Sequence, residues 1–213
     1  MTPGQSELID KIRRLQVEIA NRTYDYWMLY SHPGTWQFWT LLLLFVLPLV
    51  ALFFFLDRRR ALLIGFFGFN IHVWHTYVDL LGTNYGRWAY PYRLFPFMPE
   101  SVVIDSSLVP VAFMYVYQWT LIRGKNFYGY AAALSLFFAF LVKPALITFG
   151  LFEMYAGMNV VLLWISFLFV AVVSKWITDV FLSIQIRGEG ESGRREPGLP
   201  RIRRWFSLRE RVK

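Results

Sequence analysis

Cysteine is absent from this 213-residue chain, which excludes disulfide bonds and thiolate metal ligands. Redox chemistry therefore says nothing about the compartment. Charged residues are also scarce, at 17%, whereas hydrophobic residues make up 56% and aromatic residues 20%. The hydrophobic residues occur in long blocks rather than in an amphipathic pattern, which is typical of an integral membrane protein.

Several familiar signals are missing as well. The chain contains no internal repeat, no heptad run and no glycine-rich phosphate loop, and residues 1–35 are too polar for a secretory signal. The net charge of +8 does not indicate nucleic acid, because the basic residues lie beside the ends of the hydrophobic blocks, where topology and anionic lipid account for them. Membrane lipids are the expected partners, and no cofactor or protein partner is indicated.

Five segments are long enough to cross about 30 Å of hydrocarbon, which takes about 20 helical residues. They cover residues 36–56, 61–81, 102–122, 127–149 and 158–184. The sequence therefore predicts an all-α fold, a polytopic transmembrane bundle of about five spans. With the amino terminus outside, fourteen basic residues fall in the inner segments and six in the outer ones, which places the carboxy terminus in the cytoplasm. The expected location is the plasma membrane of a bacterium.

The region before the bundle, residues 1–35, is expected to combine an amphipathic helix with an aromatic interfacial segment. Ser6 is positioned to cap this helix, and apolar residues from Leu8 to Ile19 follow helical spacing. Such a helix either lies on a surface or packs against the bundle.

The region after the bundle, residues 185–213, is expected to be a basic cytoplasmic tail. Residues 187–200 have the glycine, proline and charge content of a flexible linker. Residues 201–213 alternate apolar and basic side chains, which is typical of a segment on an anionic inner leaflet, although a solvated tail explains the pattern equally well.

Ionisable residues gather in the outer half of the predicted bundle. His72, His75 and Asp79 follow steps of three and four, so they share one helix face. At 1.5 Å per residue they lie roughly 3 to 13 Å from the outer end, and Asp105 and Lys143 lie about 5 and 9 Å from the same end of their own spans. Polar groups at this depth usually face a protein interior or a wet cavity. The candidate site consists of His72, His75, Asp79, Glu100, Asp105 and Lys143, with Glu100 at the rim.

Three interpretations of this candidate site remain open. In the first it is polar packing, in which Lys143 pairs with a carboxylate and the histidines bind backbone groups or Ser106. In the second it performs acid–base or proton-coupled chemistry, as an enzyme or a transporter. In the third it holds a metal, but the histidines lack the spacing of known metal motifs, so no metal ligands are assigned.

The connection over residues 82–99 is rich in proline and aromatic residues. Trp88, Tyr90 and Tyr92 are candidates for a lid over the site, and an ordinary aromatic anchor at the membrane interface is the alternative. Lys175 and Asp179, four residues apart, are expected to form an ion pair within one helix.

The run VDLLGTNYGRWAYPYRLFPFMPESVVIDSSLVPVAFMYVYQW, with LDRRRALL before it and FFAFLVKPALITFGLFEMY and VSKWITD after it, resembles a family of uncharacterised small multi-pass membrane proteins of Bacillus-like and Paenibacillus-like Firmicutes. The resemblance covers residues 24–182. It implies a five-span or similar bundle in the plasma membrane, and it implies no activity, substrate or cofactor. The family pattern has an acidic residue where this chain has Lys143, and His72 and His75 are not part of that pattern.

Two functions are compatible with these observations. The first is an integral plasma-membrane protein whose candidate site binds a small ligand, an ion or a lipid. The alternative is an intramembrane lipid- or isoprenoid-active enzyme that uses carboxylate acid–base chemistry. The alternative rests on a likeness to lycopene cyclase bundles, whose order of residues is similar to that of Trp88, Tyr90 and Glu100, with Ser101 in place of a second carboxylate.

Overall fold

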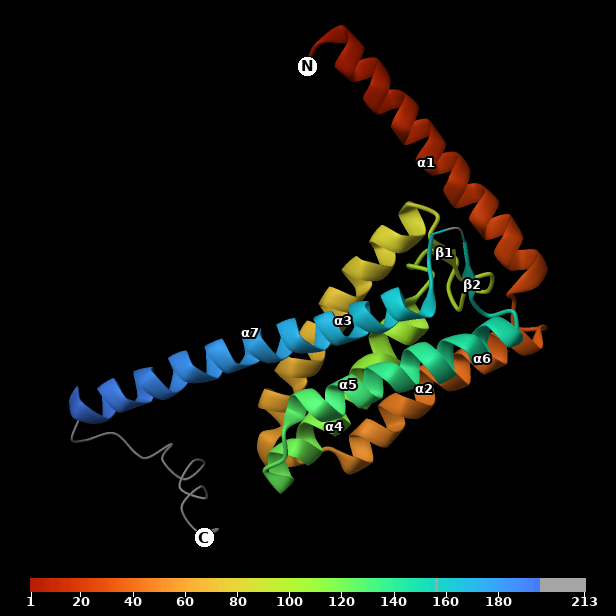
Figure 1. The fold of residues 1–213 in the computed structure, drawn as a ribbon. Helices are drawn as coiled ribbons and strands as arrows, with labels where there is room; N and C mark the ends of the chain where they lie inside the picture. Colours follow the sequence, from red (N-terminus) through yellow and green to blue (C-terminus); the bar gives the residue numbers. More distant parts are fainter. Residues whose placement is uncertain (156, 196–213) are drawn as a thin grey trace.

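The computed structural model describes residues 1–155 and 157–195, and it is almost entirely helical (Figure 1). Within these residues, four helices are long and apolar enough to cross a membrane: Trp36–Phe55, Arg58–Asn84, Phe127–Thr148 and Val160–Arg187. Their length and composition are those of a membrane protein, and they confirm four of the predicted spans.

Most of the helices follow one another through short connections, but longer ones join α3 to α4 and α6 to α7. Their bounds are α1 Pro3–Tyr30, α2 Trp36–Phe55, α3 Ala61–Asn84, α4 Val109–Arg123, α5 Phe127–Phe137, α6 Lys143–Thr148 and α7 Val160–Arg195. Side chains cap several starts: Thr35 accepts a hydrogen bond at the start of α2, and Asn126 does so at the start of α5. Gly124, with φ of 61°, forms the turn between α4 and α5, a conformation that costs glycine little.

The predicted third span is helical without a break over residues 102–123, but it is not among the four long apolar helices. The reason is its polar content, which includes Asp105, Ser106, Ser107 and Gln118. These residues are tolerated because the segment packs against α2, α3 and α5, and many of its side chains are buried in these contacts.

Two helices widen just before a proline. The π-helical turn Ile104–Leu108 precedes Pro110, and the π-helical turn Phe138–Val142 precedes Pro144. Proline lacks the backbone N–H and its ring clashes with the carbonyl four residues earlier, so the preceding turn must adjust. Isolated π-helical turns often occur at functional sites, and here one contains Asp105 and the other directly precedes Lys143.

Helix α3 lies at the centre of the bundle, between α4 and α7. Its Phe67 packs against Tyr117 of α4 and Phe127 of α5, with ring centroids 4.4 and 5.5 Å apart. Aromatic pairs of this kind contribute about 0.5–1.5 kcal/mol each, so these contacts help to hold together the helices that carry the candidate site.

Helix α1 extends away from the bundle, and none of its 28 residues is buried (Figure 1). Thr2 caps it and Pro3 occupies its first turn, so the prediction that Ser6 caps the helix was wrong. Proline is favoured at this position because its missing N–H would be unpaired there anyway. Near the end of the helix, the indole N–H of Trp27 donates to the backbone carbonyl of Arg93, 3.0 Å away.

A small sheet joins two connections on one side of the bundle. Strand β1 (Trp88–Ala89) pairs antiparallel with β2 (Glu153–Met154), so the chain after α3 is tied to the chain after α6. Trp88 is buried against Gly82, where a Cβ atom would lie only 1.9 Å from the indole ring.

The last helix is longer than predicted. α7 continues to Arg195, so the linker prediction for residues 187–200 was wrong for residues 187–195, which are helical. The rest of that linker and the basic segment of residues 201–213 lie outside the described residues. The intrahelical pair is confirmed, because the Lys175 ammonium binds both carboxylate oxygens of Asp179.

Candidate functional site

Three parts of the fold converge on a buried group of ionisable side chains. His75 and Asp79 come from α3, Asp105 from the π-helical turn before α4, and Lys143 from the start of α6. All four side chains are buried. We call His75, Asp79, Asp105 and Lys143, together with Tyr90, the buried cluster. The structure thus brings four of the six candidate site residues together.

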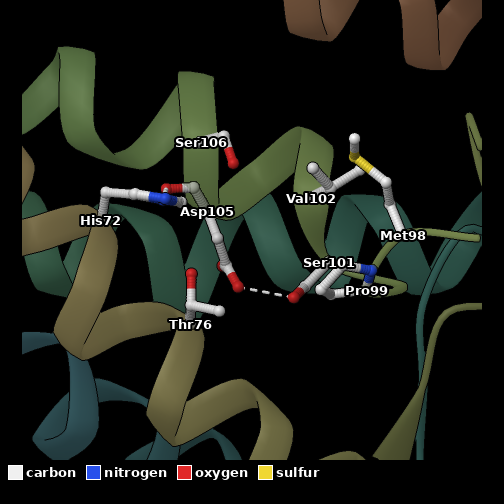
Figure 2. A pocket seen from close by; sticks show the side chains of 8 residues that line it. All are labelled: His72, Thr76, Met98, Pro99, Ser101, Val102, Asp105 and Ser106. Atoms are coloured by element: carbon white, nitrogen blue, oxygen red, sulfur yellow. Dashed lines mark hydrogen bonds between the residues drawn. The ribbon is translucent and has the colours of Figure 1, made fainter.

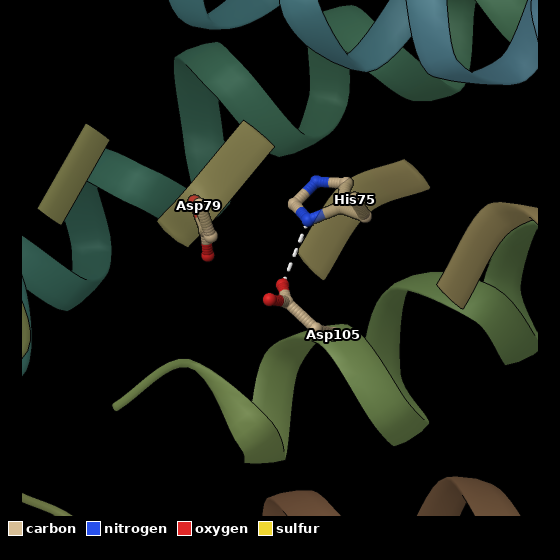
Figure 3. Close-up of side chains that lie close together, drawn as sticks. All are labelled: His75, Asp79 and Asp105. Atoms are coloured by element: carbon tan, nitrogen blue, oxygen red, sulfur yellow. Dashed lines mark hydrogen bonds and ion pairs between the residues drawn. The ribbon is translucent and has the colours of Figure 1, made fainter. Parts of the chain in front are cut away.

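Asp105 is the acceptor for two buried donors. The Nδ1 atom of His75 lies 2.7 Å from Asp105 Oδ1 (Figure 3), and the Ser101 hydroxyl donates to Asp105 Oδ2 at 2.5 Å. The imidazole of His75 also packs on Phe167, with ring centroids 4.7 Å apart. Both side-chain oxygens of Asp105 therefore have a partner within the protein.

Asp79 and Lys143 are connected through Tyr90. The Lys143 ammonium donates to the Tyr90 oxygen at 2.8 Å, and the Tyr90 hydroxyl donates to Asp79 Oδ2 at 2.6 Å. The ammonium also lies 3.7 Å from the centre of the Phe152 ring, a cation–π geometry. Burial, reinforced by the charge of Asp79, raises the pKa of Tyr90 well above its ordinary value of 10. Tyr90 therefore stays protonated and relays the interaction between the two charges.

The three candidate lid residues have different surroundings. Tyr90 and Trp88 are buried, and only Tyr92 is partly exposed. Tyr90 belongs to the buried cluster itself, held there by its position directly after β1 and by contact with Phe152, 5.1 Å between ring centroids. The connection therefore supplies a side chain to the site, and its role as a lid stays a prediction.

Glu100 and His72 lie outside the buried cluster. Glu100 forms an ion pair with Arg93 and accepts a hydrogen bond from the backbone N–H of Tyr90 at 3.3 Å. The Nδ1 atom of His72 lies 2.9 Å from the backbone carbonyl of Asp105. Because a carbonyl oxygen only accepts, Nδ1 carries the hydrogen, and neutral His72 then has an acceptor lone pair on Nε2.

A pocket of about 250 Å³ opens beside the buried cluster (Figure 2). Eight residues line it: His72, Thr76, Met98, Pro99, Ser101, Val102, Asp105 and Ser106. The Thr76 hydroxyl oxygen is buried there and has no hydrogen-bond partner among the described residues. Asp105 and Ser101 therefore belong both to the pocket wall and to the hydrogen-bonded network around the buried cluster.

A metal ion is one species that the buried cluster can hold. His75, Asp79 and Asp105 each offer a ligand atom, and these atoms lie within 4.8 Å of one another. A zinc ion commonly takes three such protein ligands plus one further group. Because the Lys143 ammonium already offsets one of the two carboxylate charges, a divalent ion would leave the buried cluster with a net positive charge.

Sequence reasoning missed three contributors to the site: Ser101, Thr76 and Phe152. Ser101 precedes Asp105 by four residues, and this helical spacing was the signal that pairs them. Ser106, expected as a histidine partner, instead lines the pocket. Thr76 and Phe152 carried no signal, because a threonine in a helix and a phenylalanine in an apolar run are ordinary residues of a membrane bundle.

Comparison with known proteins identifies no relative of this chain. No protein family, curated protein or solved structure matches the chain. Any function must therefore be argued from the side chains themselves.

Proposed function

We propose that this protein is a five-span plasma-membrane protein of a bacterium, with its amino terminus outside, that binds a small ligand in the pocket beside Asp105 and exchanges a proton with it. The fifth span is the helix over residues 102–123, whose polar side chains face the bundle. The orientation rests on the excess of basic residues in the segments assigned to the inner side.

Asp105 carries the proposal, because it lines the pocket and also binds buried His75. A ligand that reaches Asp105 perturbs a carboxylate–imidazole pair, in which a proton moves over a short distance at little cost. Ionisable groups at hydrocarbon depth are expensive, and they usually serve an ion, proton or substrate pathway.

The charges of the buried cluster support proton exchange. Two carboxylates, Asp79 and Asp105, face one ammonium, that of Lys143. With His75 neutral the buried cluster carries one negative charge, and with His75 protonated it is neutral. Since an uncompensated charge is costly in a low-dielectric interior, one proton or one other cation is needed to balance it.

The test compares the wild type with Asp105→Asn and with Asp179→Asn as the matched control, since Asp179 pairs with Lys175 within α7, outside the candidate site. Each protein is purified in detergent, and native mass spectrometry identifies any small molecule that it retains. That molecule is then added back in weak buffer, and proton release or uptake is followed with a pH indicator.

The expected result is a ligand and a proton signal in the wild type and in Asp179→Asn, and the loss of both in an Asp105→Asn protein that still folds. A folded Asp105→Asn protein that retains both would refute the proposal. A wild type in which no ligand binds would refute it as well.

The second candidate is the lipid- or isoprenoid-active enzyme. It is favoured by the two buried carboxylates of Asp79 and Asp105. A carboxylate oxygen of each and a ring nitrogen of His75 all lie within 4.8 Å of one another. Carboxylates and histidines are the residue types that acid–base catalysis on a lipid needs. Its test is turnover of an added prenyl lipid or membrane lipid extract, analysed by chromatography and mass spectrometry. An enzyme predicts that Asp79→Asn folds and loses turnover, whereas a binding protein consumes none of the added lipid.

A further inference from the structure

We infer that the pocket beside Asp105 takes a protonated primary amine, either a small soluble amine or the amine headgroup of a lipid. This inference rests on the proposed function and adds the chemical class of the ligand. It depends on the charge of the pocket, on the polarity of its available atoms and on its size.

The charge of the pocket favours a cation. Its eight lining residues include one carboxylate, that of Asp105, and no lysine or arginine. Behind this wall, Asp79 adds a second carboxylate, and Lys143 supplies one ammonium to the buried cluster. An anionic ligand would be repelled by this arrangement, whereas an ammonium group would supply the positive charge that balances it.

The polar atoms available to a ligand can all act as acceptors, although the two hydroxyls can also donate. The Nδ1–H of His72 is used by the backbone carbonyl of Asp105, which leaves the Nε2 lone pair. The Thr76 hydroxyl is buried without a partner among the described residues, and the Ser106 hydroxyl also lines the pocket. A primary ammonium has three N–H donors and no acceptor, and it can satisfy several of these atoms at once. A quaternary ammonium has no N–H and cannot do so.

The pocket has room for a small group and an apolar edge for its carbon chain. Its volume of about 250 Å³ exceeds that of a single ion, and the pocket is partly open at the surface. The ligand atoms of His75, Asp79 and Asp105, in contrast, are all buried. Met98, Pro99 and Val102 form the apolar part of the wall, and Figure 2 shows them beside Ser101 and Asp105. Methylene groups attached to the ammonium would lie against these side chains.

The experiment titrates the detergent-purified full chain with ethanolamine, ethylene glycol and choline, and follows binding by calorimetry. The three probes share a hydroxyl and differ in charge and in N–H donors. Ethanolamine is expected to bind at least about tenfold more tightly than either of the others.

A parallel arm uses native mass spectrometry after exchange into equal mixtures of phosphatidylethanolamine, phosphatidylcholine and phosphatidylglycerol. Preferential retention of phosphatidylethanolamine, without ethanolamine binding, identifies a lipid amine; ethanolamine binding alone identifies a soluble amine.

Two variants test the acceptors without removing a charge. Thr76→Val keeps the side-chain volume and removes one hydrogen bond, so amine binding should weaken about fivefold, and His72→Phe should weaken it by a similar factor. Thr148→Val is the control, because the Thr148 hydroxyl only binds the carbonyl of Pro144 within α6 and is exposed. It should bind the amine as the wild type does.

The inference is overturned if no amine is preferred in either arm, or if Thr76→Val and His72→Phe both bind as the wild type does. A neutral or anionic ligand that depends on Asp105 and exchanges a proton would overturn the amine inference and leave the proposed function standing. Failure of every ligand, with Asp105→Asn indistinguishable from the wild type, would refute both.

Discussion

Removal of one oxygen atom, by Tyr90→Phe, should destabilise the bundle more than any other conservative change at the site. The hydroxyl accepts from Lys143 at 2.8 Å and donates to Asp79 at 2.6 Å, and all three side chains are buried. Hydrogen bonds to charged groups contribute about 1.5–3 kcal/mol each, so the loss of two costs about 3–6 kcal/mol. The phenyl ring keeps its contact with Phe152, which confines the change to the hydroxyl.

The assay is thermal unfolding of the detergent-purified protein. For a chain of this size, each kcal/mol lowers the melting temperature by roughly 2–4 °C, so a fall of at least about 6 °C is expected. Tyr155→Phe is the matched control, because the Tyr155 hydroxyl donates to Glu153 at 2.7 Å on an exposed surface. Such a bond contributes little, and its loss should shift the melting temperature by less than about 3 °C. Equal shifts in the two variants would refute the reasoning that Tyr90 links two buried charges.

Other substitutions test neighbouring features of the fold. Gly82→Ala should lower the melting temperature, because its Cβ would lie 1.9 Å from the indole ring of Trp88. Gly65→Ala is the control: no atom lies within 4 Å of its Cβ position, so the melting temperature should stay unchanged or rise. The reverse order of the two melting temperatures would contradict the packing. Lys143→Met leaves two buried carboxylates without their cation and should cost about 3–5 kcal/mol in thermal unfolding, and a neutral effect would show that the carboxylates are already protonated. Since the chain lacks cysteine, Tyr85→Cys and Lys125→Cys report topology directly: in intact cells a membrane-impermeant maleimide should label the first and not the second, and the opposite pattern would invert the proposed orientation.

The sequence predicted the helices well, because hydrophobic length and helical spacing are properties of a single segment. The face shared by His75 and Asp79, and the depth at which Asp105 meets it, followed from a rise of 1.5 Å per residue. These quantities need no knowledge of how distant parts of the chain pack.

The sequence did not predict features that depend on pairing between distant segments. Tyr90 was assigned to a lid because aromatic residues near proline usually lie at the interface, yet pairing of β1 with β2 brings its hydroxyl between two buried charges. The cap of α1 was misassigned because Thr2 and Ser6 are equally good capping residues, and Pro3 decided between them. Helix α7 continues through residues 187–195, although their glycine and charge content usually indicates a linker.

The bridge from Lys143 through Tyr90 to Asp79 also has a consequence for biosynthesis. Because a chain is made from its amino terminus, Asp79 and Asp105 enter the membrane before Lys143 has been synthesised. The Lys143 ammonium offsets one of these charges only when the third of the four long apolar helices, Phe127–Thr148, arrives, and the pairing of Trp88 with Met154 then holds the connections together. A nascent chain that stops before residue 143 would expose carboxylates without this counter-charge to lipid. Assembly of the whole bundle therefore depends on the synthesis and insertion of Lys143.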